Sequence, residues 1–175
     1  MKIENLQNGR IALVENADTA SEMRFGDFDA SDVYIIERHR FGGSRDQYVK
    51  TVEFILKQDN ELVLLEAKSK TSREYFAETC DKMFDSLNKY FSFAAGRNSD
   101  EKYREFAIDM SAVSFHFYLV VKRLDMAFAK QANDTFARAI KERFSLSFIN
   151  IWQLSIPKNV TVMSYESAKK ANIAI

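Results

Sequence analysis

Three charged residues interrupt apolar segments near the middle of the chain: Glu53, Glu66 and Lys68. The segments around them, TVEFILK and ELVLLEAK, are otherwise typical of buried strands. A charge in such a strand costs on the order of several kcal/mol unless it is paired, hydrogen-bonded or bound to a metal ion. We therefore expect these residues to hold one another, a ligand or a metal ion.

The turn between the two segments predicts how the charged residues face one another. Asp59 and Asn60 can both adopt the positive φ angles of a tight turn. A hairpin closed symmetrically on this pair places Glu53 opposite Glu66. Directly opposed side chains have Cβ atoms about 4.5–5.5 Å apart, so two carboxylates there would repel each other. A hard divalent cation such as Mg²⁺ relieves that repulsion, and so does a proton on one carboxyl group.

Lys68 is expected on the same face as Glu66, because side chains alternate along a strand. Two carboxylates and an amine then converge, which is a combination suited to hydrolysing a phosphodiester. A metal ion held by Glu53 and Glu66 would neutralise charge in the transition state and lower the pKa of a bound water. Lys68 would orient or deprotonate that water, or stabilise the phosphate. The alternative is a solvated sheet face that carries a cross-strand ion pair.

The Glu-Ala-Lys triplet at 66–68 follows an acid by thirteen residues and precedes a predicted helix. This pattern resembles the core motif of the PD-(D/E)XK nuclease superfamily, whose fold is the restriction-endonuclease-like core. In that family the first acid lies on one strand, and the second acid and the lysine lie on the next; Glu53, Glu66 and Lys68 match these places. The resemblance implies a nuclease that requires Mg²⁺, with Mn²⁺ as a substitute, built on a mixed sheet flanked by helices.

Two features bear on how closely the chain follows that family. The first acid of the family is usually Asp and often follows Pro, whereas Val52 and Glu53 stand here. Some members add an acid from the first helix. By that resemblance Glu22 is the candidate for a third metal ligand, and Asp18 is a weaker one.

Basic residues cluster in the sequence around the two strands. Lys70 shares the expected face of Lys68, and Arg73 opens the following helix, so both are expected to contact phosphates near the scissile bond. Arg38 and Arg40 precede the first of the two strands and are further candidates for nucleic-acid contact. The alternative is an ordinary solvated surface.

The composition favours an ordered globule. Hydrophobic residues make up 46% of the 175 residues, and no stretch rich in Pro, Gly or Ser divides the chain, which predicts a single domain over 1–175. Lys plus Arg equals Asp plus Glu at 25 each, so attraction to a polyanion requires a local basic patch. The single cysteine, Cys80, excludes an internal disulfide. No apolar run reaches the ~20 residues of a membrane helix, so we expect a soluble, cytoplasmic protein without membrane contact.

Hydrophobic periodicity predicts an α/β fold with a mixed central sheet flanked by helices. The core is expected over 18–124, and 125–175 add a helix and one more strand. A brief helix is expected at 18–25. The expected strands are 11–16, 32–40, 47–57, 61–70, 114–124 and 159–165. The expected longer helices are 71–95, with Thr71 and Glu74 as a capping box and Gly96 as its stop, and 125–143, capped by Asp125.

These features predict a small metal-dependent nuclease that cuts DNA rather than RNA, with Glu53, Glu66 and Lys68 as the catalytic residues. A core of this size is expected to act as a homodimer or as one subunit of a larger complex. Restriction, repair or defence is the context that analogy of fold suggests. The alternative is a catalytically inactive protein of the same fold that binds another protein through its Phe-rich faces.

Overall fold

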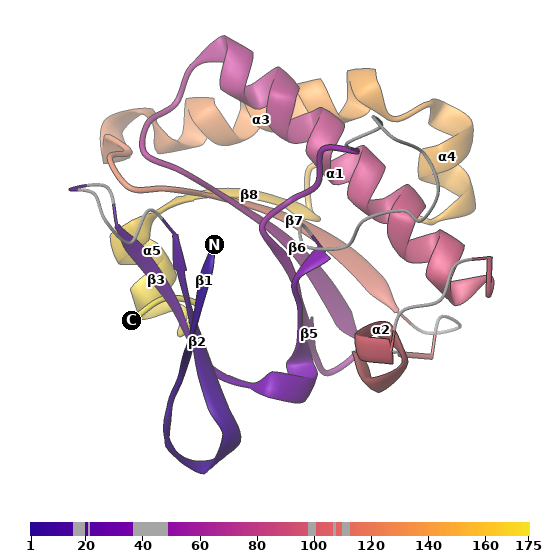
Figure 1. The fold of residues 1–175 in the computed structure, drawn as a ribbon. Coiled ribbons are helices and arrows are strands. Elements are labelled where there is room, and N and C mark those ends of the chain that lie inside the picture. Colours follow the sequence, from indigo (N-terminus) through magenta and orange to yellow (C-terminus); the bar gives the residue numbers. More distant parts are fainter. Residues whose placement is uncertain (16–19, 21, 37–48, 98–100, 107, 110–112) are drawn as a thin grey trace.

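A five-stranded mixed sheet forms the middle layer of the structure (Figure 1). In spatial order its strands are β4 (Val33–Tyr34), β5 (Phe54–Gln58), β6 (Glu61–Lys68), β7 (Ser114–Val121) and β8 (Val160–Ser164). The pairs β4–β5 and β5–β6 are antiparallel, whereas β6–β7 and β7–β8 are parallel. The structure is a computed structural model, and it describes residues 1–15, 20, 22–36, 49–97, 101–106, 108, 109 and 113–175.

Helices cover one face of this sheet (Figure 1). α1 (Arg73–Ala94) joins β6 to β7, with the short α2 (Glu101–Phe106) on the way, and α3 (Ala129–Arg143) leads from β7 towards β8 through α4 (Leu146–Ile151). α1 begins at Ser72, whose hydroxyl accepts a hydrogen bond from the Tyr75 N–H at 3.2 Å. Its apolar stripe packs against the sheet and consists of Phe76, Cys80, Met83, Leu87 and Tyr90.

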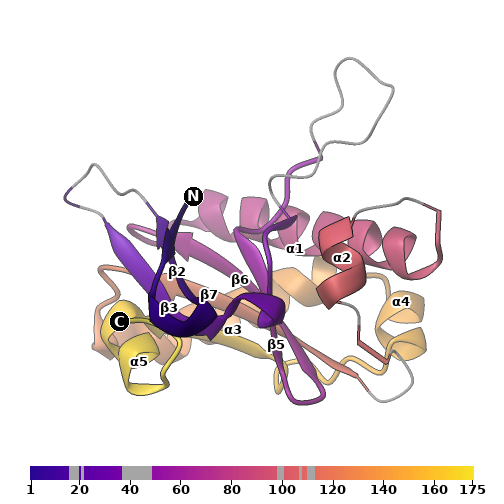
Figure 2. The same ribbon diagram turned by 60° about the horizontal axis from the view of Figure 1, so that its bottom comes forward.

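A second sheet and the C-terminal helix cover the opposite face (Figure 2). This sheet is antiparallel and contains β1 (Lys2–Asn5), β2 (Arg10–Glu15) and β3 (Met23–Asp29). Phe25 and Phe28 of β3 both contact Phe54 of β5, with ring centroids 5.7 and 6.1 Å apart. The helix α5 (Tyr165–Lys170) and the end of the chain lie on the same side, where the Ile175 N–H donates to the Arg24 carbonyl at 3.0 Å.

Strand β6 is therefore buried on both faces. Leu62 and Leu64 pack with the helices, whereas Val63 and Leu65 pack with the second sheet. Because side chains alternate along a strand, Glu66 falls on the side of the helices. A charged group is thus placed between the sheet and α1, where neighbouring side chains rather than water must stabilise it.

Most of the predicted elements are present. The short strand at 11–16, the hairpin over β5 and β6, the strands β7 and β8, and the helices at 71–95 and 125–143 are confirmed, with ends shifted by a few residues. Leu56 pairs with Val63 as the symmetric turn requires. Asp125 does cap, but it caps the 3₁₀ turn Met126–Phe128 that precedes α3.

Several predictions are wrong. The helix expected at 18–25 is a strand from Met23 onwards, because Met23, Phe25 and Phe28 supply the apolar side of β3. The strand expected over 47–57 begins only at Phe54, and the described part of 32–40 is strand only at Val33–Tyr34. Ser72 rather than Thr71 caps α1. The second face of the central sheet is covered mainly by another sheet instead of a helical layer.

Candidate active site

Glu66 is the centre of a cluster of charged side chains between β6 and α1. Its side chain is 0% exposed, and its Oε1 atom lies 2.6 Å from Lys82 Nζ and 3.1 Å from Lys68 Nζ. The two lysine side chains retain 18% exposure at Lys68 and 16% at Lys82. The buried carboxylate is thus paired with two lysines whose side chains are partly exposed.

Helix α1 contributes two members of this cluster that were not predicted from the sequence. Lys82 donates a hydrogen bond to Glu66, and Glu78, one helical turn earlier, lies 3.8 Å from Lys68 Nζ. Lys68 also lies over the ring of Tyr75, 5.5 Å from its centroid. The available signal was the i, i+4 spacing of Glu78 and Lys82 beside the apolar stripe, which places both next to the sheet. That spacing is equally typical of a solvated ion pair, so it did not single them out.

Glu53 lies beside the same cluster, although it is not paired with Glu66 in the sheet. It occupies a bend immediately before β5, and its N–H donates to the Leu65 carbonyl at 3.1 Å. Val52 on its N-terminal side packs with the helices, and its N–H donates to Ser86 Oγ at 2.9 Å. The expected strand pairing of Glu53 with Glu66 is therefore absent. The negative charge of Glu53 nevertheless contributes to raising the pKa of Lys82.

The electrostatics of the cluster follow from its burial and its charges. Burial raises the pKa of Glu66, and Lys82 and Lys68 offset only part of that effect. Burial alone would lower the pKa of Lys82, but the carboxylates of Glu66, Glu53 and Glu78 outweigh it, so the pKa is raised and Lys82 is an ammonium ion at neutral pH. With all groups ionised, three carboxylates face two ammonium groups, which leaves one negative charge.

The second oxygen of Glu66 is the feature that fits a metal ion. Oε2 is buried and has no hydrogen-bond partner among the described residues. A buried carboxylate oxygen without a partner is costly, so a cation or a water there would stabilise the site. Mg²⁺ is usually held by one or two carboxylates together with substrate phosphates and waters, and the Oε2 atom of Glu66 fits the role of one such ligand. Among the residues that the structure describes, no group of three or more His, Cys, Asp or Glu residues is arranged to hold a metal ion.

The other predicted site residues are not among the described members of the Glu66 cluster. Glu22 precedes β3 instead of lying on a helix, and its carbonyl accepts a hydrogen bond from Lys122 Nζ at 2.6 Å. It does not join Glu53 and Glu66 in a three-ligand group. Lys70 is exposed in the loop after β6, and Arg73 is the first residue of α1. The remaining two candidates, Arg38 and Arg40, lie outside the described residues.

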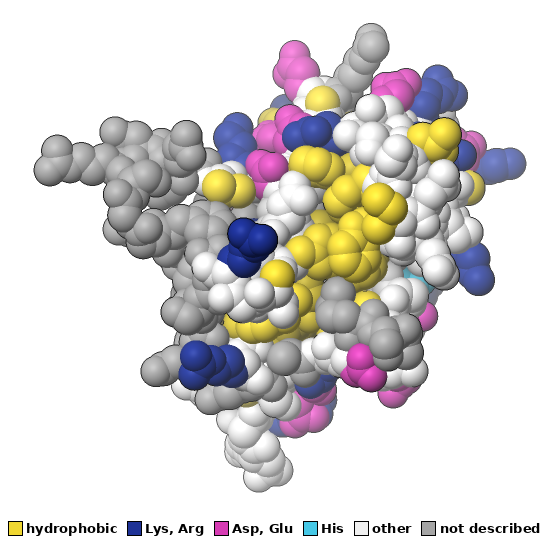
Figure 3. Space-filling view, turned by 90° about the vertical axis from the view of Figure 1, so that its right-hand side faces the viewer, with side chains coloured by type: hydrophobic (Ala, Val, Ile, Leu, Met, Phe, Trp, Pro, Cys, Tyr) yellow, Lys and Arg dark blue, Asp and Glu magenta, His cyan; other side chains and the backbone are white. Residues whose placement is uncertain are grey.

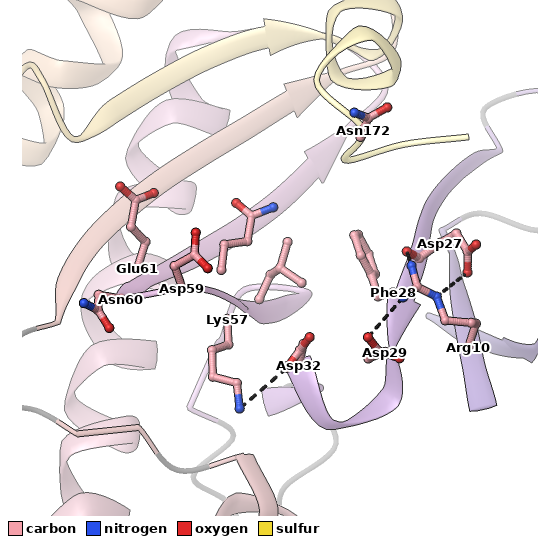
Figure 4. Close-up of a pocket in the computed structure, with 12 residues that line it drawn as sticks. Arg10, Asp27, Phe28, Asp29, Asp32, Lys57, Asp59, Asn60, Glu61 and Asn172 are labelled. Carbon is pink, nitrogen blue, oxygen red and sulfur yellow. Dashed lines mark hydrogen bonds and ion pairs between the residues drawn. The ribbon is translucent and has the colours of Figure 1, made fainter. Parts of the chain in front are cut away.

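A larger pocket lies elsewhere, between the β5–β6 turn and the end of β3 (Figure 4). Its volume is about 710 Å³, and five acidic residues line it against two basic ones. Both basic residues are already paired, Arg10 with Asp27 and Asp29, and Lys57 with Asp32. This pocket has three more acidic than basic residues, whereas the Glu66 cluster has only one more, so the pocket repels a phosphodiester backbone more strongly and the cluster is the better candidate for that chemistry.

Comparisons with models of protein families, with curated proteins and with solved structures found no match. Within the described residues, no helix has both the length and the apolar character needed to cross a membrane. The geometry of the chain itself is therefore the basis for a functional assignment.

Proposed function

We propose that the protein is a metal-dependent nuclease that hydrolyses phosphodiester bonds, in DNA rather than RNA, with Glu53, Glu66 and Lys68 at its active site. The observation that carries the proposal is the buried Glu66 carboxylate, which has one oxygen shared by two lysines and the other without a partner in the part of the chain that the structure describes. Buried polar atoms in folded proteins are mostly hydrogen-bonded, so an oxygen without a partner and a second lysine at the same carboxylate both support a ligand-binding role. Both are useful where a cation and a phosphate must be bound together.

The order of the elements supports the same proposal. Three antiparallel strands, then a helix, then a strand parallel to the third, is the order expected of a restriction-endonuclease-like core, and β4, β5, β6, α1 and β7 follow it. Glu66 and Lys68 lie on the third of these strands, and Glu53 immediately precedes the second. This order supports the proposal, although Glu53 lies in the bend before β5 and not on the strand itself.

Four residues of the cluster have distinct roles in the proposed reaction. Glu53 and Glu66 would hold Mg²⁺, which when bound lowers the pKa of a water and neutralises charge on the phosphate. Lys68 is positioned by Glu66 and by the ring of Tyr75, so its ammonium group can hydrogen-bond a phosphate oxygen or the attacking water. Lys82 compensates the buried Glu66 charge and keeps that carboxylate oriented.

A cleavage assay tests the proposal. Plasmid, linear duplex and single-stranded DNA would be incubated with Mg²⁺ or Mn²⁺ and with either the wild-type protein or Lys68→Ala. We expect the substitution to reduce the rate by at least about 100-fold, the usual contribution of a positioned proton donor or acceptor. Lys130→Ala, which removes an exposed lysine from α3, is the matched control and should cut normally. Unchanged cutting by Lys68→Ala would refute the assignment.

A second candidate function is supported by an apolar surface on another side of the molecule. Hydrophobic side chains gather on one face of the molecule (Figure 3). Leu146 and Ile151, the first and last residues of α4, are exposed. Trp152, the residue that follows α4, stacks on Phe91 of α1 with ring centroids 3.9 Å apart. Such a surface is typical of a protein interface, either in a homodimer or in a larger complex. Self-association that Leu146→Glu abolishes, together with no cleavage of any substrate, would favour a role in assembly.

A further inference from the structure

A smaller pocket lies at the edge of the central sheet where β6 and β7 end. Its volume is about 330 Å³, within the range of small-ligand sites, and it is formed by the loops that follow the two strands and by the start of α3. The loops run side by side, since the Lys122 N–H donates to the Lys68 carbonyl at 2.9 Å and the Arg123 N–H to the Ser69 carbonyl at 3.2 Å. In α/β sheets this edge, outside the carboxyl ends of parallel strands, is where ligands commonly bind.

Two lining residues of the pocket lie close in the sequence to residues of the Glu66 cluster. Thr71 lines it and lies three residues after Lys68, so their Cα atoms are at most about 11 Å apart. Phe76 also lines it, and the neighbouring Tyr75 contacts Lys68. A polymer chain held in this pocket would therefore pass within one or two units of the proposed catalytic lysine.

The lining combines an aromatic ring, a cation and hydrogen-bonding groups. Phe128 lines the pocket and is 58% exposed, an unusual state for a phenylalanine. Arg123 is exposed beside it, and its guanidinium has no ion pair with any described residue. Asp125, the acidic residue in the lining, already accepts a hydrogen bond from the Ala127 N–H at 2.9 Å. Gln131 adds an exposed amide at the rim.

We propose that this pocket binds one unpaired nucleotide of a single-stranded nucleic acid, whose base stacks on Phe128 and whose phosphate contacts Arg123. A base inside a duplex has both faces stacked on its neighbours, so an open aromatic ring selects an unpaired one. This inference rests on the proposed function and narrows it to substrates with a single-stranded segment or a frayed end next to the scissile bond. The pocket is a binding subsite and takes no part in the chemistry.

Binding of a fluorescent thymidine dodecamer, measured by anisotropy in EDTA over a salt series, tests the inference without catalysis. We expect Phe128→Ala to weaken binding about tenfold at every salt concentration, as loss of one stacked base does. Arg123→Ala should weaken binding and also flatten the slope of log K against log salt by about 0.7, the value for one phosphate contact on a single strand. Phe128→Trp should restore the affinity and serves as a check on folding.

Neighbouring residues outside the pocket provide controls. Met126→Ala removes an equally exposed apolar side chain, 64% accessible, and Lys130→Ala removes an exposed cation, and both should bind as wild type does. Equal affinities for Phe128→Ala and Met126→Ala, or no binding of the dodecamer, would overturn the inference. If Lys68→Ala and wild type both bind the dodecamer but neither cuts, the subsite stands and the nuclease proposal fails. If wild type cuts and Phe128→Ala binds and cuts equally well, the subsite fails alone.

Discussion

Lys82 is the residue whose removal most directly tests the physical account of the cluster. Lys82→Met keeps an unbranched side chain of similar length and removes the ammonium group that lies 2.6 Å from Glu66 Oε1. Glu66 then remains buried with Lys68 alone, at 3.1 Å. Because the Glu66 side chain is 0% exposed, it has no contact with bulk water that would replace the lost ion pair.

The magnitude follows from these distances. At an effective dielectric constant of about 20, opposite charges 2.6 Å apart attract by roughly 6 kcal/mol before the cost of desolvation is subtracted. Removing one partner of a buried pair generally costs about 3–5 kcal/mol. Because Lys68 still offsets part of the charge, we expect Lys82→Met to lower the free energy of unfolding by about 2–3 kcal/mol. For a domain of this size that corresponds to a fall in Tm of roughly 4–12 °C.

Urea unfolding at pH 7.5 and pH 5 provides the assay, with Lys130→Met as a control on an exposed lysine. The pKa of Glu66 is raised in the folded protein, and loss of Lys82 raises it further. A raised folded pKa gives stability that is present at low pH and is lost as the pH rises through that pKa. The deficit of Lys82→Met should therefore be smaller at pH 5 than at pH 7.5. A deficit no larger than that of Lys130→Met, or one that does not change with pH, would refute the reasoning.

Two further predictions concern metal binding and the backbone. Mn²⁺ binding should weaken by up to tenfold per pH unit once the pH falls below the raised pKa of Glu66, because a proton then competes with the metal ion for the carboxylate. Calorimetric titration with Mn²⁺ at several pH values measures this effect. The variant Glu66→Gln should bind no Mn²⁺. Gly26 has φ +144°, and a Cβ there would lie 2.9 Å from the Ile11 carbonyl oxygen, whereas Gly96, at φ +67°, has open space around it. Gly96→Ala should therefore cost about 1 kcal/mol and Gly26→Ala distinctly more in thermal unfolding, and equal costs would contradict this steric account.

Much of the central sheet was predictable because its signals are local. The apolar run of β6 and the positive φ that Asp59 adopts in the turn (+50°) fix the hairpin and its register. From that register and the alternation of side chains, the convergence of Glu66 with Lys68 follows without tertiary information. The apolar stripe of α1 was predictable for the same reason, since its apolar residues recur every three or four positions.

The features that were missed depend on contacts between distant parts of the chain. Val52 and Ile55 pack on the same side of the sheet, although simple alternation would place Val52 with Phe54; the bend at Glu53 makes the difference. The hydrogen bond from the Val52 N–H to Ser86 on α1 helps to hold that bend, and no local sequence pattern predicts this hydrogen bond. Lys82 was missed for the same reason, because its role depends on how α1 lies over Glu66.

All the charged groups of the cluster come from one uninterrupted stretch of chain, from Glu53 through the hairpin to Lys82 on the first long helix. The second sheet, α3 and the tail support this unit from outside without contributing a charge to it. In evolution this continuous segment could therefore be retained as one unit, while the segments of the chain around it are replaced. Relatives would then be recognised by a short ββα segment with this charge pattern, even where the rest of the chain has diverged.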